Sequence, residues 1–234
     1  MAATLSEALR ETIRVQEGRI PLLARHLARL KAGGCDDVVL ADARTKALRA
    51  AEAWANEYGR MSLHVAVDGS VWVEVTTSPS TIDVPGGPRI ALVTSEEPHL
   101  PPGGAKPEDR SFWDRALEQA RRAGADVAVL VSPTGHVIDT SQATLWLCRG
   151  DRLLTPPSPP ALAGVSRAVV FDFAASLGLR AEEKVLFAED LDTADELLLT
   201  TAVAGAVAVR DRRGPVTEAL TKMFAQVFAG GADA

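Results

Sequence analysis

The chain has 234 residues, 47% of them hydrophobic, which is enough for one large domain or two small ones with a sizeable core. Its formal net charge is −6, from 25 basic and 31 acidic residues, and no run of lysine or arginine is long enough to indicate nucleic-acid binding. Composition and charge therefore disfavour both an intrinsically disordered chain and a nucleic-acid partner.

The two cysteines, Cys35 and Cys148, lie far apart and lack metal-ligand spacing. The sequence therefore predicts neither a disulfide framework nor a metal site. No apolar run approaches the roughly 20 residues of a membrane-spanning helix, and the first residues do not resemble a signal peptide. We expect a cytoplasmic protein without a membrane partner.

The first part of the chain predicts a small α+β domain over residues 1–84. Alternating apolar residues predict strands and helical spacing predicts helices, while Gly33-Gly34 ends the first helix and Asp68-Gly69 forms a two-residue hairpin turn. The expected elements, in chain order, are a strand over residues 9–15, helices over 22–30 and 41–58, and strands over 62–67 and 71–75.

The prolines and glycines of residues 85–105 predict an interdomain linker region, with one short strand over 89–94 inside it. A larger domain is expected over residues 106–234. Its predicted elements are helices over 110–123, 164–177 and 215–228, and strands over 126–131, 136–139, 145–148, 152–154, near Val185, 197–200 and 206–210.

Lys106 lies at the end of the proline- and glycine-rich loop, just before a predicted helix. Taken alone, such a lysine is most simply a solvated surface charge. A lysine held beside a buried sheet can instead react with a carbonyl, because burial lowers its pKa and frees the amine.

Several short motifs accompany this lysine: Glu11-Thr12-Ile13-Arg14-Val15, His26-Leu27-x-Arg29-Leu30, Lys106-x-x-x-Arg110, Val137-Ile138-Asp139-Thr140-Ser141, Gly164-Val165-Ser166-Arg167 and Asp190-Leu191-x-x-Ala194-Asp195-Glu196-Leu197. In this order and spacing, over residues 8 to about 211, they resemble the class IV pyridoxal-phosphate enzymes. That family includes branched-chain and D-amino-acid aminotransferases and 4-amino-4-deoxychorismate lyase. The resemblance implies the α+β, two-domain fold type IV, whose larger domain is built around a closed β-structure. It also implies pyridoxal 5′-phosphate as cofactor, a small-molecule substrate and a homodimer.

The same resemblance implies the residues that hold the cofactor. Lys106 falls where the family has the lysine that binds the cofactor covalently, and Asp139 where it has the acid that pairs with the pyridine nitrogen. Such a carboxylate keeps the ring protonated, so that the ring can accept electrons. The family uses glutamate at this position and usually asparagine five residues later, where this chain has Thr144. Asp139 could alternatively be a strand-end residue that caps a turn.

The expected phosphate site combines backbone donors with one cation. Gly164, Val165 and Ser166 open a helix and supply aligned N–H groups. Arg29 matches the family's phosphate arginine, although a surface arginine is the simpler interpretation of that residue alone. Thr200 and Thr201 resemble the second phosphate loop, in which Ala202 replaces a frequent threonine. His26 is expected to be structural.

Thr12 and Arg14 are two residues apart on a predicted strand and point to the same face. Thr12 matches the hydroxyl that the lyases place beside the cofactor, so we assign it a catalytic role, and we assign Arg14 to substrate binding. The first interpretation is therefore 4-amino-4-deoxychorismate lyase, an enzyme of folate biosynthesis that eliminates pyruvate and leaves 4-aminobenzoate. A branched-chain or D-amino-acid transaminase is the alternative. A non-catalytic protein that keeps the fold is a third hypothesis, suggested by Asp139, Thr144 and Ala202.

Overall fold

The computed structural model describes residues 4–77 and 80–230, which form two compact units. Of the described residues, the small unit contains 4–77, 80, 100–109 and 226–230. The large unit consists of residues 81–99 and 110–225. This division differs from the expected 1–84, 85–105 and 106–234, because the expected linker is shared between the units and Lys106 belongs to the small one.

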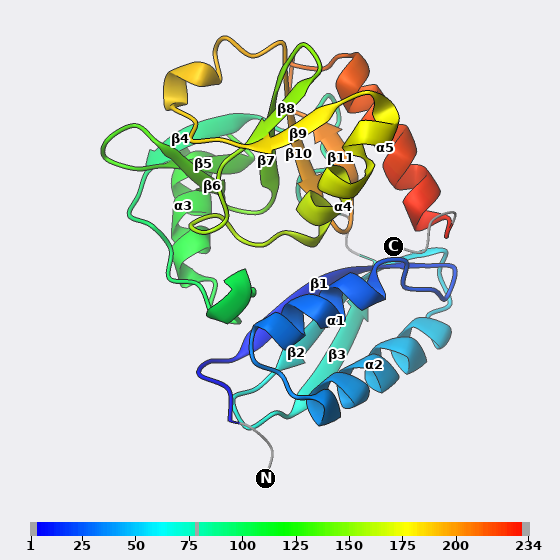
Figure 1. Ribbon diagram of the computed structural model, residues 1–234. Coiled ribbons are helices and arrows are strands. Elements are labelled where there is room, and N and C mark those ends of the chain that lie inside the picture. The colour runs from blue at the N-terminus through cyan, green and yellow to red at the C-terminus, as the bar shows by residue number, and fades with distance from the viewer. Residues whose placement is uncertain (1–3, 78–79, 231–234) are drawn as a thin grey trace. The chain divides into compact units, whose positions relative to one another are not determined.

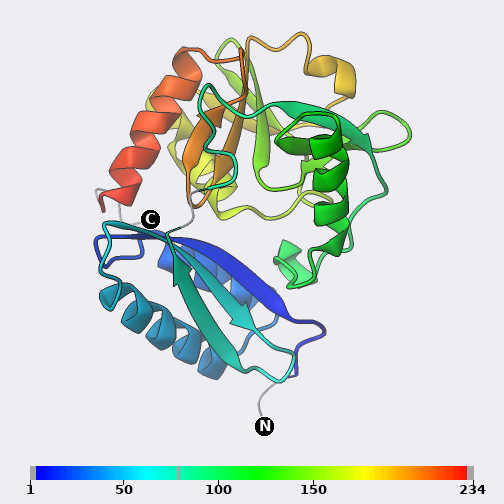
Figure 2. The same ribbon diagram turned by 180° about the vertical axis from the view of Figure 1, so that it is seen from behind.

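The small unit is a three-stranded antiparallel sheet with two helices on one face (Figure 1). In Figure 2 its strands lie in front of the helices. Buried and half-buried residues alternate along the first two strands, because successive side chains point to opposite faces of a sheet. The sheet order is β1-β2-β3, and the elements are β1 (Leu9–Gln16), α1 (Leu23–Ala32), α2 (Asp37–Glu52), β2 (Tyr58–Val65) and β3 (Val71–Thr76).

The second helix begins and ends earlier than the expected range of residues 41–58. It begins after Asp36, whose carboxylate accepts hydrogen bonds from the N–H groups of Val38 and Val39 and so caps the helix. It ends at Glu52, and Tyr58 already begins β2. The alanine-rich composition predicted the helix, whereas the aspartate cap fixes its first residue.

The large unit contains two open sheets. One has the order β4-β5-β6, with β4 parallel to β5, and the other has the order β11-β10-β7-β8-β9. The strands are β4 (Ile90–Thr94), β5 (Val127–Val131), β6 (Val137–Thr140), β7 (Thr144–Arg149), β8 (Arg152–Thr155), β9 (Arg180–Glu183), β10 (Glu196–Thr201) and β11 (Gly205–Ala208). The helices are α3 (Ser111–Arg122), α4 (Val165–Phe173) and α5 (Pro215–Phe228), with 3₁₀ turns η1 (Pro102–Gly104), η2 (Ala174–Leu177) and η3 (Ala188–Asp190). Of these elements, η1 and the last three residues of α5 belong to the small unit.

The expectation of a closed β-structure is wrong for the part of the chain that the structure describes. After β6 the chain turns sharply, with the N–H of Ala143 donating to Thr140 Oγ1 at 2.9 Å, and β7 then pairs with β8 and β10 instead of β6. The strand expected near Val185 lies earlier, at Arg180–Glu183, and Val185 itself is exposed. No helix within the described ranges is long and apolar enough to cross a membrane.

Candidate active site

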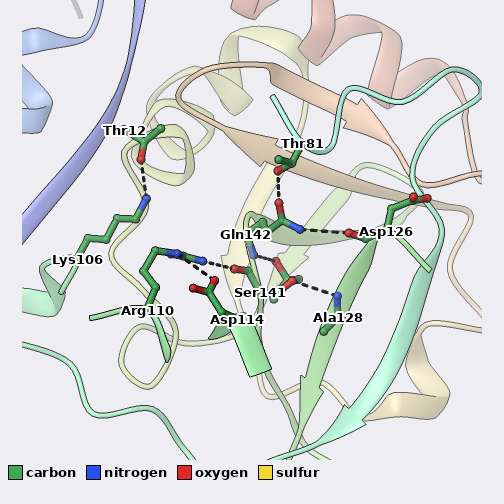
Figure 3. A network of polar contacts seen from close by, with 10 residues as sticks. Thr12, Thr81, Lys106, Arg110, Asp114, Asp126, Ala128, Ser141 and Gln142 are labelled. Atoms are coloured by element: carbon green, nitrogen blue, oxygen red, sulfur yellow. Dashed lines mark hydrogen bonds and ion pairs between the residues drawn. The ribbon is translucent and has the colours of Figure 1, made fainter. Parts of the chain in front are cut away.

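Lys106 contacts Thr12, its predicted neighbour in the active site, although 94 residues separate them. The Nζ of Lys106 donates a hydrogen bond of 2.9 Å to Thr12 Oγ1, and both residues are half-buried (Figure 3). The backbone around Lys106 lies along β1, where the N–H of Arg10 donates to the Lys106 carbonyl (3.0 Å) and the N–H of Glu108 to the Ala8 carbonyl (2.9 Å). The amine is therefore held at a defined place on β1 rather than on a mobile surface side chain.

The turn before Lys106 depends on a glycine. Gly103 has φ +64°, and a Cβ there would lie 2.6 Å from the Cβ and 2.8 Å from the carbonyl oxygen of Ala32. Only glycine fits both the left-handed backbone and this close approach to the end of α1. The glycine content of the loop thus serves to bring the lysine to the sheet.

The face of the small sheet that carries Thr12 is rich in arginine. Thr12 and Arg14 share this face, as predicted, because buried and half-buried residues alternate along β1. The register pairs Arg14 with Arg60 and Arg10 with His64, which places Arg10 and Arg60 on the same face. Two of these arginines were missed in the sequence, although strand alternation and the hairpin register could have indicated them.

These guanidinium groups lie close enough to influence one another. Burial lowers the pKa of Arg60, and the positive charge of Arg10 lowers it further. Arg14 stacks on the rings of Tyr58 and Phe228, with its Cζ 4.8 and 4.4 Å from their centroids. Three cations on the face that presents the lysine favour a ligand that carries carboxylates.

On the opposite face of β1, Glu11, His26 and Arg29 form a cluster that we call the buried triad. Arg29 donates from Nε to Glu11 Oε1 at 2.8 Å and from Nη2 to Glu11 Oε2 at 2.5 Å. His26 Nδ1 lies 2.6 Å from Glu11 Oε2. The side-chain exposures are 0% for Glu11, 1% for His26 and 8% for Arg29, so these charges are paired away from water.

Electrostatics assign the charges in the triad. Burial by itself raises the pKa of Glu11, but the charge of Arg29 and the hydrogen bonds from His26 and Arg29 outweigh burial and hold that pKa at about 2. Burial lowers the pKa of His26 despite the nearby Glu11 charge, and the charges of Arg29 and Lys106 lower it further. A neutral His26 therefore donates its Nδ1 hydrogen to an ionised Glu11.

The triad bears on the expectations for Arg29 and His26, and it contains Glu11, which was not expected. The interpretation of Arg29 as a solvated surface arginine is wrong, because the side chain is buried. His26 packs in the interior, as expected of a structural histidine. Glu11 was not predicted as a site residue, although a glutamate at a core-facing position of an alternating strand is a signal that could have found it.

In the large unit, Asp139 lies at the end of β6 and is 6% exposed. Its Oδ1 accepts from the N–H of Thr140 at 2.8 Å and its Oδ2 from the N–H of Leu162 at 3.0 Å. Burial raises its pKa to about 7, although these two hydrogen bonds and the charges of Arg167 and Arg110 act in the opposite direction. Asp139 thus ties β6 to the segment that leads into α4, and a further cation beside it would favour its charged form.

The predicted phosphate segment begins two residues after Leu162. Gly164 is the N-cap of α4, and no side chain caps this helix end. A Cβ at Gly164 would lie 2.7 Å from Thr144 Oγ1, so the strand and the helix start meet only because this residue is glycine. Thr144, which stands where the family has asparagine, therefore packs directly against the expected phosphate segment.

The two expected phosphate segments converge through β7. Thr144 pairs with Thr200 in the β7–β10 register, and Trp146 Nε1 donates to Thr200 Oγ1 at 3.0 Å. Thr201 Oγ1 accepts from the N–H of Ala204 at 2.9 Å, which shapes the turn after β10. Val165 and Ser166 are buried in the first turn of α4. The large unit thus gathers Asp139, the start of α4 and the end of β10.

Arg110 connects α3 to the strand that carries Asp139. Its Nη2 donates to the Ser141 carbonyl at 2.7 Å, and Ser141 Oγ accepts from the N–H of Ala128 at 3.1 Å (Figure 3). This arginine belongs to the motif Lys106-x-x-x-Arg110, and its role in the fold is to fix the end of β6.

The raised pKa of Asp139 predicts a pH-dependent stability of the protein without ligand. Between its ordinary value of 3.8 and its folded value of about 7, the folded state binds more protons than the unfolded state. Stability contributed by the protonated form is therefore present below pH 4 and lost as the pH rises to 7. One pKa unit corresponds to about 1.4 kcal/mol, so the expected loss is about 4 kcal/mol. Urea unfolding between pH 4 and pH 8 should show this change as a difference between wild type and Asp139→Asn, and a pH-independent difference would contradict it.

The chain matches the family pattern "Amino-transferase class IV" over residues 8–211. The branched-chain-amino-acid aminotransferase of Pseudomonas aeruginosa is 30% identical over 128 residues, which cover 51% of this chain and 42% of that enzyme. The chain thus matches about two fifths of the length of the first curated relatives. Among solved structures, a hypothetical aminotransferase from Mycobacterium tuberculosis in its PLP-bound form has a TM-score of 0.82 at 22% identity, over 97% of this chain and 90% of that one.

A second solved structure, of a protein proposed to be a 4-amino-4-deoxychorismate lyase, has a TM-score of 0.76 at 26% identity and covers 93% of this chain and 89% of that one. The family match extends from the strand that carries Thr12 to beyond the end of β10. The predicted family and the α+β fold are confirmed, apart from the closed β-structure. The chain belongs to the class IV aminotransferase family.

Proposed function

We propose that the protein is a pyridoxal-phosphate enzyme that acts as a 4-amino-4-deoxychorismate lyase, releasing pyruvate and leaving 4-aminobenzoate. The observation that carries this proposal is the 2.9 Å hydrogen bond from Lys106 Nζ to Thr12 Oγ1. It sets a hydroxyl beside the amine that removes the substrate proton. The solved structure of a proposed lyase supports the same choice.

Each unit, taken by itself, offers side chains or N–H groups whose chemistry suits a part of the cofactor. Lys106 offers an amine held on β1, and Arg29 offers a buried guanidinium. Gly164, Val165 and Ser166 offer the N–H groups of a helix start, and the close approach of Thr144 to Gly164 leaves no room for a side chain there. Asp139 offers a buried carboxylate whose charged form needs a neighbouring cation, as a protonated ring nitrogen provides.

The mechanism follows from the chemistry of two side chains. Bound pyridoxal phosphate supplies an electron sink for the pair left when the substrate Cα loses its proton. Lys106 would hold the cofactor through its Nζ, and as a free amine the same group would take that proton as a general base. In the substrate, the bond between the carbon of its six-membered ring and the enol-ether oxygen then breaks. Thr12 Oγ1, already in contact with Lys106 Nζ, relays the proton to the methylene carbon of the departing pyruvate.

The arginine-rich face favours a substrate with carboxylates. Arg14 was assigned to substrate binding from the sequence, and Arg10 and Arg60 share its face. Because guanidinium groups form two parallel hydrogen bonds with a carboxylate, this face suits an acidic amino compound. We expect these arginines to hold the carboxylates while Lys106 meets the reacting carbon.

An amino-acid transaminase is the second candidate, because curated relatives that are 30% identical over part of the chain are named branched-chain-amino-acid aminotransferases. The same lysine and the same arginine face serve amino-group transfer to a keto acid. In either case we expect a small-molecule substrate and a homodimer, as the family resemblance implies.

One assay separates the candidates. Wild type should release pyruvate from aminodeoxychorismate with no amino acceptor present. Thr12→Val should lower that rate by roughly 10²–10⁴-fold, the usual contribution of a positioned proton-transfer group, whereas Thr12→Ser keeps the hydroxyl and most of the rate. Amino transfer to a keto acid without pyruvate release would establish the transaminase instead. Cofactor binding without either reaction would establish a non-catalytic protein.

A further inference from the structure

The buried triad places three polar side chains in the interior, where apolar side chains would fill the same space. Glu11 engages two donors of Arg29 and one nitrogen of His26, yet all three side chains are at least nine-tenths buried. The other imidazole nitrogen, His26 Nε2, is buried and has no hydrogen-bond partner among the residues that the structure describes. Such an unpaired atom costs stability, and an apolar residue of similar size would avoid that cost.

The two-point contact between the Glu11 carboxylate and the Arg29 guanidinium restrains the guanidinium. The carboxylate contacts the guanidinium along the edge formed by Nε and Nη2, at 2.8 and 2.5 Å, which fixes both the position and the plane of the group. His26 Nδ1 contacts the same oxygen as Nη2 and so restrains the carboxylate as well. One residue along β1, Thr12 contacts Lys106. Neighbouring residues of one strand therefore set the positions of the amine and the guanidinium.

We propose that Glu11 is a positioning residue that, restrained by His26, orients Arg29 to bind the phosphate of the cofactor. The proposal rests on the proposed function in one respect, namely that Arg29 receives a phosphate group. Glu11 itself does not contact the ligand. Its contribution is to hold the guanidinium in one orientation before the phosphate arrives, so that little freedom is lost on binding.

Two other roles for Glu11 make different predictions. If Glu11 only neutralised Arg29, removing its charge would strengthen the binding of an anion, and shortening the side chain would leave binding unchanged. If Glu11 only stabilised the fold, its variants would lower thermal stability without changing affinity for a phosphate compared with a ligand that lacks one.

The test compares binding of pyridoxal 5′-phosphate and of pyridoxal, which lacks the phosphate, to the full-length protein freed of cofactor. Glu11→Asp keeps the charge but withdraws the carboxylate by one methylene, which breaks the two-point contact. We expect it to weaken pyridoxal-phosphate binding roughly tenfold, the lower end of the loss seen when partners that orient a binding group are removed. Pyridoxal binding should not change. Glu11→Gln keeps the length and one acceptor and should weaken binding less. Glu52→Asp, at the exposed end of α2, is the matched control.

Arg29→Lys keeps a cation for Glu11 but loses the planar fork, and it tests the underlying assumption separately. If Arg29→Lys leaves phosphate-dependent binding unchanged, the phosphate assignment fails. If Arg29→Lys weakens binding but Glu11→Asp does not, only the positioning role fails. A rise in affinity in Glu11→Gln, with no change in Glu11→Asp, overturns the proposal in favour of charge neutralisation. Thermal melts of each variant identify misfolding, and in a destabilised variant an equal loss for both ligands also counts against the positioning role.

Discussion

Replacing Lys106 with alanine is expected to abolish covalent attachment of pyridoxal phosphate and all turnover. In the wild type, borohydride reduction should fix the cofactor to Lys106, because only a linkage through that amine is reduced to a stable bond. Peptide mapping by mass spectrometry locates the label, and the cofactor's absorbance reports its attachment.

The structure indicates that the fold survives this substitution. The Lys106 segment is held on β1 by main-chain hydrogen bonds at Arg10 and Glu108, which an alanine at position 106 retains. The lost side chain is only half-buried, so stability should change by about 1 kcal/mol or less. Lys222→Ala, an exposed position on α5, is the matched control and should keep the label. A label on Lys31, Lys46, Lys184 or Lys222 in the wild type would show that the assignment of Lys106 is wrong.

Asp139→Asn is expected to leave attachment of the cofactor intact but to slow removal of the substrate Cα proton. A carboxylate beside the ring nitrogen stabilises its protonated form and an amide does not. Close ion pairs shift a pKa by about 1–3 units, so the expected loss in rate is between about tenfold and a thousandfold. Single-turnover measurement of proton removal, with a substrate deuterated at Cα, isolates this step.

Asp139→Glu should preserve activity or raise it, because the family has glutamate at this position and the longer side chain reaches further. In the wild type the N–H groups of Thr140 and Leu162 donate to the Asp139 carboxylate. The longer glutamate side chain must give up or share these two hydrogen bonds, and the activity of Asp139→Glu depends on that change. Asp192→Asn, at an exposed position, is the control. Equal rates for wild type and Asp139→Asn would reduce Asp139 to a residue that anchors the segment before α4.

The local pattern of the sequence was sufficient for nearly all secondary structure. Strand alternation predicted β1, including the shared face of Thr12 and Arg14, and the hairpin turn at Asp68-Gly69 predicted the pairing of β2 with β3. Helical spacing and glycine stops predicted α1, and α5 has the bounds expected from the sequence, residues 215–228. These features depend on neighbours within one element or one turn, which a sequence displays directly. The motif order likewise identified the family.

Tertiary structure decided which of these elements meet. Periodicity along a strand does not show whether sheets close. A turn of three residues between β6 and β7 separates two sheets, where the resemblance implied one closed β-structure. Lys106 was expected in the larger domain, but hydrogen bonds between its backbone and β1 place it in the small unit. Pairing of strands distant in sequence is set by long-range contacts, and no local pattern encodes it.

The candidate site divides in the same way. The family resemblance of the sequence implied Lys106, Thr12, Arg29 and Asp139 as site residues. Only the structure showed that Lys106 Nζ reaches Thr12 Oγ1, that Arg29 is paired with Glu11 in the interior, and that the register adds Arg10 and Arg60 to the lysine face. The physical reason is that charge, burial and pKa depend on which groups lie within a few ångströms. Those distances arise when strands and helices far apart in the chain pack together.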